Sequence, residues 1–156
     1  MDIKPVPAGD LLKLVDESVR EVIRVVADAK RTGGFFCYAL GQSLIGMWRI
    51  GQIADEAAAQ KCIRNVLEKA SRLAHRPDDV SSWQTRKPQE HQYGGAIRTT
   101  GGILSFSGLT EEMDETAMLL VAIASHTCQL PPVTALRIAG VSGNRLFPSL
   151  AKLPSN

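Results

Sequence analysis

A chain of 156 residues is long enough for one domain and too short for two ordinary ones, so we expect residues 1–156 to form a single domain. Hydrophobic residues make up 44% and charged residues 22%, as in most globular proteins, and a net charge of +2 is too small to indicate a nucleic-acid partner. Three cysteines without CxxC spacing predict no disulfide framework, and residues 1–10 contain no apolar segment typical of a leader. We therefore predict a cytoplasmic protein with no nucleic-acid and no membrane partner.

Apolar spacing predicts two helices and two strands in the first half of the chain. A stripe at intervals of three and four residues predicts a helix from Asp10 to about Val26. Near-continuous apolar runs at 35–40 and 44–50 predict buried strands joined by a short turn. Asp55 is placed to cap a second helix that runs to about Ala74, and Pro77 follows it.

The second half begins with a polar segment, 77–93, which we expect to be a long loop without regular structure. Two further strands are predicted at 96–99 and 103–106, and Thr110 is placed to cap a helix that continues to about His126. A short helix from about Leu130 to Gly140 is expected, with proline tolerated in its first turn, and the remaining tail is expected to be irregular.

The order of these elements predicts the class of fold. Each pair of consecutive strands has a link too short for a parallel crossover, so each pair should be antiparallel. An α+β fold best accommodates this order, in which a helix, two strands, a helix, two strands and a helix follow one another. We predict a four- to five-stranded antiparallel sheet with flanking helices.

Three segments of the sequence resemble the GlcG/HbpS family, which includes the C-terminal domain of PduO-type proteins. They are WRIGQIADEAAAQKCIRNVLEKASRLA, YGGAIRT and GGILSFSGLTEEMDETAMLLVAIA. The positions that match the family's motifs are a strand arginine, a helix lysine, paired glycines, a Ser-Gly turn and a helix aspartate: Arg49, Lys61 or Lys69, Gly94-Gly95, Ser107-Gly108 and Asp114. The resemblance covers about residues 10–126 and leaves 127–156 as a C-terminal extension.

This resemblance implies a profilin-like fold and assembly into dimers or larger oligomers. Some members of the family bind haem, and others accompany metabolic operons without an established activity. The resemblance implies no set of catalytic residues.

His91 and Tyr93 are candidate haem ligands, because both residue types coordinate haem iron. The alternative is a solvated histidine and an aromatic ring packed at the edge of the sheet. Arg49, beside Trp48 on a short strand, is a candidate pocket residue because neighbouring strand residues point to opposite faces.

The turn at Ser107 and Gly108 is either a backbone nest for an anion or the cap of the following helix. The acids that follow it should repel a phosphate: Glu111, Glu112, Asp114 and Glu115. An oligomer contact or a neutral, cationic or metal-bearing ligand is therefore favoured over a phosphate at this turn.

Together these features predict a non-catalytic small-molecule-binding protein, with haem as a candidate ligand. Its pocket would lie between the sheet and the 77–93 loop, near Arg49, His91, Tyr93, Ser107 and Gly108. The alternative is a homo-oligomeric scaffold that makes contacts through exposed strand edges. An enzyme ranks last, because no acid–base pair or nucleophile motif is visible, and no His/Cys cluster predicts zinc.

Overall fold

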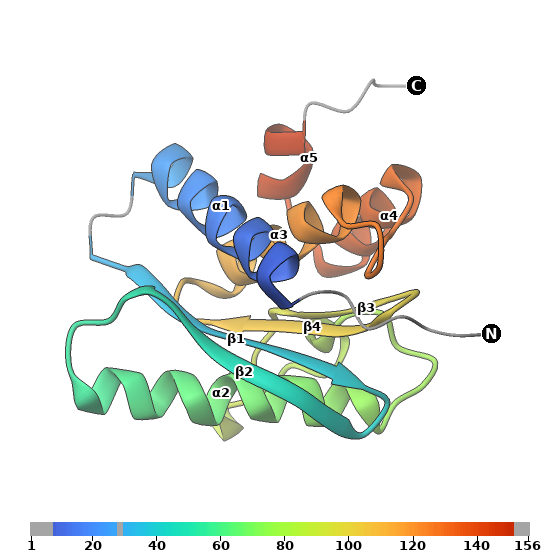
Figure 1. The fold of residues 1–156 in the computed structure, drawn as a ribbon. Coiled ribbons are helices and arrows are strands. Elements are labelled where there is room, and N and C mark those ends of the chain that lie inside the picture. Colours follow the sequence, from blue (N-terminus) through green and yellow to red (C-terminus); the bar gives the residue numbers. More distant parts are fainter. Residues whose placement is uncertain (1–7, 28–29, 152–156) are drawn as a thin grey trace.

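Four strands form one antiparallel sheet in the computed structural model, which describes residues 8–27 and 30–151 (Figure 1). They are β1 (Thr32–Leu40), β2 (Ser43–Gln52), β3 (Ala96–Thr99) and β4 (Gly102–Ser107), in the spatial order β2-β1-β4-β3. The α+β class and the antiparallel pairing are confirmed, and within the described ranges the sheet has four strands and no fifth. β1 and β4 are the central strands, and β2 and β3 are the edges.

Aromatic residues occupy the centre of this sheet. Phe36 on β1 pairs with Trp48 on one side and with Phe106 on the other. The rings of Phe36 and Trp48 stack with their centroids 5.9 Å apart. Such cross-strand pairs stabilise the register, because slipping by one residue would move every ring to the opposite face.

Helices cover both faces of the sheet (Figure 1). α2 (Glu56–Ala74) packs on one face, where Val66 and Leu73 join a small core with Cys37 and Ile103. α1 (Ala8–Val26) and α3 (Glu111–Ala124) pack on the other face, over the larger core. The predicted stripe on α1 is confirmed by the burial of four of its residues, Leu11, Val15, Val19 and Val22. No helix of the described chain is both long and apolar enough to cross a bilayer.

The C-terminal segment contains more structure than the sequence predicted. α4 (Pro132–Ser142) continues past Gly140 and ends where Gly143 adopts a left-handed conformation, φ 67°. The expectation of an irregular tail is wrong, because α5 (Leu146–Ala151) follows and seats Phe147 in the larger core with none of its surface exposed. A six-residue helix is too short to show an apolar period, so spacing in the sequence does not predict it.

The 77–93 segment is also more ordered than expected. It contains two short 3-10 helices, η1 (Ser82–Thr85) and η2 (Pro88–Glu90). The Arg72 guanidinium on α2 donates hydrogen bonds to the carbonyls of Ser82 and Tyr93, both at 2.6 Å. These bonds tie both ends of the segment to α2.

Candidate functional site

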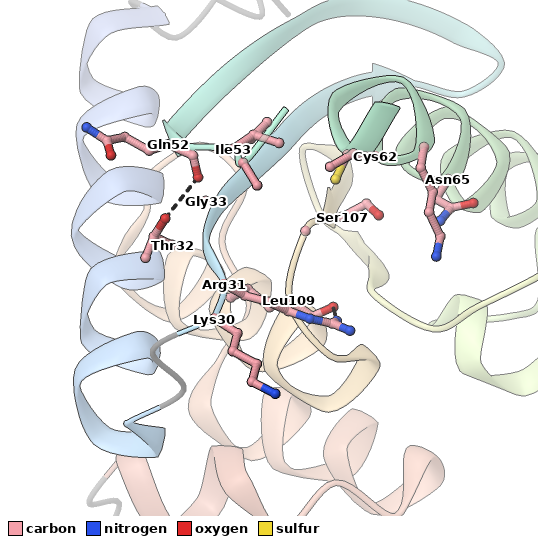
Figure 2. Close-up of a pocket in the computed structure, with 14 residues that line it drawn as sticks. Lys30, Arg31, Thr32, Gly33, Gln52, Ile53, Cys62, Asn65, Ser107 and Leu109 are labelled. Carbon is pink, nitrogen blue, oxygen red and sulfur yellow. Dashed lines mark hydrogen bonds between the residues drawn. The ribbon is translucent and has the colours of Figure 1, made fainter. Parts of the chain in front are cut away.

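A cleft opens at one end of the sheet, where four parts of the chain converge (Figure 2). Its lining comes from the start of β1 and the two residues before it, the end of β2, the first half of α2, and the turn between β4 and α3. The volume of about 460 Å³ lies within the usual range for small-molecule sites. We call this feature the basic cleft, because its charged lining is entirely cationic.

Three basic side chains line the basic cleft, namely Lys30, Arg31 and Lys61, and no described Asp or Glu does. Arg31 Nη1 donates a hydrogen bond to the Leu109 carbonyl at 2.8 Å, which holds the guanidinium against the turn between β4 and α3. Among the residues that the structure describes, neither Arg31 nor Lys61 forms an ion pair with a carboxylate. Six basic side chains elsewhere do: Arg20, Arg24, Lys69, Arg72, Arg76 and Arg86.

The rest of the lining is part polar and part apolar. Figure 2 shows Cys62 and Asn65 on α2 facing the strand ends, with Ser107 between the helix and β1. Thr32 Oγ1 donates to the Gln52 carbonyl at 3.1 Å and closes the β1–β2 side. Burial raises the pKa of the Cys62 thiol, so this group is a neutral thiol at neutral pH rather than a nucleophilic thiolate.

Glycines allow the strand ends to come together at this cleft. Gly34 lies against the Ser107 carbonyl, and Gly108 lies against the Gly33 carbonyl. A Cβ at either glycine would collide with that carbonyl oxygen. Only residues without side chains permit this approach. The turn after β4 therefore sits directly against the start of β1.

A buried ion pair fixes the same turn from below. Lys69 Nζ lies 3.0 Å from Asp114 Oδ2 and donates to the Phe106 carbonyl at 2.8 Å. Asp114 Oδ1 accepts from the Leu109 amide at 2.9 Å, and both charged residues are at most 2% exposed. Burial raises the pKa of the Asp114 carboxyl, and the Lys69 ammonium and the Leu109 amide oppose that rise. The pair joins α2, β4 and α3 next to the turn at Ser107 and Gly108.

Glu111, in the first turn of α3, also has partners. Glu111 pairs with Arg86, with Nη2 and Oε2 2.5 Å apart, and accepts from the Gly94 amide at 2.9 Å. Burial alone would raise the pKa of Glu111, but these two donors together lower it.

Glu115 is fully buried on the side of α3 toward α4. It accepts hydrogen bonds from Ser81 Oγ at 2.6 Å, Ser142 Oγ at 2.7 Å and Asn144 Nδ2 at 3.1 Å. Burial raises the pKa of this carboxyl, and the three donors oppose the rise. The network joins the 77–93 segment, α3 and the end of α4.

These contacts weaken the expectation that the α3 acids repel an anion at the turn, because three of the four acids have donors of their own. Glu111, Asp114 and Glu115 are each engaged by donors, and none of them lines the basic cleft. A backbone nest is not favoured either, because the Leu109 amide is taken by Asp114 and the Met113 amide by Thr110 Oγ1. The attraction for an anion comes instead from side-chain cations.

Two of the five predicted site residues line the basic cleft, namely Ser107 and Gly108. Arg49 is exposed on β2, with its guanidinium 5.9 Å from the centroid of the Phe35 ring. His91 is exposed in a left-handed conformation, φ 55°, and its Nδ1 lies 3.5 Å from the Tyr93 hydroxyl. None of these three residues lines the cleft.

The sequence reasoning missed Arg31 and Asn65 as site residues and considered Lys61 only as a family position. The basic pair Lys30-Arg31, one residue before Gly33-Gly34, was the available signal for Arg31. No group of three His, Cys, Asp or Glu side chains in the described chain is arranged to hold a metal ion.

Comparisons of this chain with protein-family models, with curated proteins and with solved structures gave no match. The geometry of the chain itself therefore carries the functional argument.

Proposed function

We propose that this protein binds a small anionic molecule in the basic cleft and performs no catalysis on it. The observation that carries the proposal is that two cations are left without an ion pair. Arg31 and Lys61 line a cleft of about 460 Å³, and no described carboxylate forms an ion pair with either of them. A guanidinium offers a planar fork of donors that suits carboxylate and phosphate groups, and an ammonium adds a point charge. A ligand carboxylate or phosphate would supply the missing partner.

The lining supports binding more than chemistry. The cleft contains residue types that can act as nucleophiles, Cys62 and Ser107 among them, but no histidine or carboxylate of the described lining is available to activate them. Asn65, Gln52 and Ser107 can donate hydrogen bonds, which orient a ligand without transferring protons to it. A site of this composition recognises its ligand and releases it unchanged.

The GlcG/HbpS-like identity and the profilin-like fold are part of the same proposal. Support comes from the antiparallel sheet with helices on both faces, and from the ion pair that joins Lys69 to Asp114, two positions on which the resemblance rests. Haem is a second ligand candidate. The cleft offers iron only the Cys62 sulfur among common haem ligands, so a haem site would have to use His91 and Tyr93 elsewhere on the surface.

Calorimetric titration with inorganic phosphate and acetate at low ionic strength tests the proposal, with Lys61→Gln and Arg64→Gln as matched variants. Both residues are exposed on α2, both substitutions remove one positive charge, and only Lys61 lines the cleft. We expect Lys61→Gln to weaken binding by about three- to tenfold and Arg64→Gln by less than twofold. Equal weakening by both variants, or no saturable binding of either anion, would overturn the proposal.

The haem alternative has its own titration. Hemin should give a saturable Soret band that shifts in His91→Ala and not in His75→Ala, which removes another exposed histidine. A band of equal position in both variants would exclude His91 as the ligand.

A homo-oligomeric scaffold is the second candidate function, and the edge strand β2 favours it. β2 has ten residues with Arg49 as its one charge, and Leu44 and Ile45 near its start are each 52% exposed. Long edge strands with little charge can pair with another strand. Light scattering after size exclusion should then show a dimer or larger species that Ile45→Lys dissociates, and a strictly monomeric wild type would refute this candidate.

A further inference from the structure

One wall of the basic cleft is apolar and has no role in the core. Ile53, Ala58 and Cys62 line the cleft at intermediate exposure. None of the three belongs to either of the two core clusters of the described chain. Leu109 also borders the cleft, but it belongs to the larger core, is 5% exposed and lies beside Arg31.

Ile53 is the informative member of this wall. A single, partly exposed aliphatic side chain is ordinary at a protein surface. Ile53 is informative because it lies in the cleft opposite α2, where Ala58 and Cys62 line the same space (Figure 2). Its apolar surface would be removed from water only by something that fills the cleft.

The apolar wall and part of the cationic lining lie on opposite sides of the cleft. Figure 2 shows Lys30 and Arg31 extending from the residues before β1 on one side, whereas Ile53 and Cys62 lie on the other. Arg31 is kept on its side by its hydrogen bond to the Leu109 carbonyl. A ligand that spans the cleft would therefore meet cations with one end and methyl and methylene groups with the other.

We propose that the ligand is an amphiphilic anion, with a carboxylate or phosphate group at Arg31 and an aliphatic or aromatic portion against Ile53, Ala58 and Cys62. This inference rests on the proposed function and specifies its ligand class. An inorganic anion would pair with the cations and leave the apolar wall exposed to water. A polyanion would place charge beside Ile53, where no described donor compensates it.

A homologous series of straight-chain carboxylates, from acetate through butanoate and hexanoate to octanoate, separates the contributions of the two ends. Each methylene that the apolar wall removes from water should tighten binding by about two- to fourfold. Ile53→Ser should flatten this dependence on chain length. Lys61→Gln should weaken every member by a similar factor and leave the dependence intact. Val133→Ser, which removes an equally aliphatic but 60% exposed side chain on α4, is the matched control and should change neither.

Cys62 provides an independent readout of where the probe binds. Cys37 and Cys128 are fully buried, whereas Cys62 is partly exposed in the cleft, so it should be the thiol that a small alkylating reagent modifies first. Octanoate should slow this modification, and octylammonium, with the same chain and the opposite charge, should not.

The outcomes distinguish this inference from the function on which it rests. If acetate, octanoate and phosphate bind with equal affinity and Lys61→Gln weakens all three, the amphiphilic ligand is wrong and the anion site stands. If Ile53→Ser leaves the dependence on chain length unchanged, the apolar wall is not the contact surface and the inference is overturned. If no anion binds, both proposals fall.

Discussion

The Lys69–Asp114 pair permits a quantitative test of how the turn beneath the cleft is held. Asp114→Asn preserves the shape of the side chain and an oxygen for the Leu109 amide, and it removes the negative charge. The Lys69 ammonium, 1% exposed, is then left with uncharged acceptors such as the Phe106 carbonyl. An uncompensated buried charge is among the most destabilising changes that a single substitution can make.

The expected magnitude follows from the geometry. At an effective dielectric constant of about 20, unit charges 3.0 Å apart attract by roughly 5.5 kcal/mol. The Leu109 amide keeps the single asparagine oxygen, and the Phe106 carbonyl still accepts from the ammonium, so Asp114→Asn should lower the free energy of unfolding by about 3–5 kcal/mol. That is about a fifth or more of the roughly 5–15 kcal/mol that stabilises a typical domain.

The double variant Lys69→Met/Asp114→Asn removes both charges and keeps the acceptor for the Leu109 amide. It loses mainly the donor to the Phe106 carbonyl, so its cost should be only about 1–2 kcal/mol. Lys69→Met alone should also be costly, because it leaves the Asp114 carboxyl buried with the Leu109 amide as its remaining donor.

Urea denaturation of all four proteins at pH 7 gives the cycle, with the slope of the transition as the check that unfolding remains two-state. A double variant that is as unstable as the sum of the two single variants would show that the charges do not interact as the structure indicates. An Asp114→Asn cost below about 1 kcal/mol would refute the reasoning altogether.

Three further predictions concern the neighbouring residues. Glu111→Gln should destabilise the protein by at most about 1 kcal/mol at pH 7. Because the folded-state pKa of Glu111 is lowered, this loss of stability should vanish as the pH falls through that pKa. Urea denaturation at pH 7 and pH 3 can check this. Glu115 has a raised folded-state pKa, so the cost of burying its ionised form is present above that pKa and relieved below it. Wild-type stability relative to Glu115→Gln should therefore increase from pH 7 to pH 5, and the opposite trend would contradict the assignment. Gly108→Ala should cost about 1–3 kcal/mol by collision with the Gly33 carbonyl, whereas Gly140→Ala, with open space around it on α4, should be neutral or stabilising in thermal denaturation.

Local patterns were sufficient for most of the secondary structure. The stripe that contains Val15 and Val19 predicted α1 because helical spacing alone places such residues on one face. The hydroxyl of Thr110 and the carboxylate of Asp55 marked the starts of α3 and α2, since capping depends on residues within one turn. Antiparallel pairing followed from the short links between strands.

The same local reasoning failed for the acids of α3. Asp114 and Glu115 lie in the first turns of a helix, where carboxylates ordinarily complement the dipole in water. Their burial depends on Lys69, 45 residues earlier in the chain, and on Ser142, 27 residues later. Spacing within one helix carries no information about partners at such distances.

The candidate site divides in the same way. The sequence by itself determined helices α1 to α4, the hairpins and the glycine turn at Ser107 and Gly108, because these depend on backbone preferences and on neighbours within a few residues. Only the tertiary structure decided that Arg31, Lys61 and Ile53 share one cleft, because strand order and helix packing bring together positions that are far apart in the chain. The charge of the cleft is therefore a property of the packed molecule: the fold directs the nearby carboxylates to other partners and leaves the cations facing the cleft.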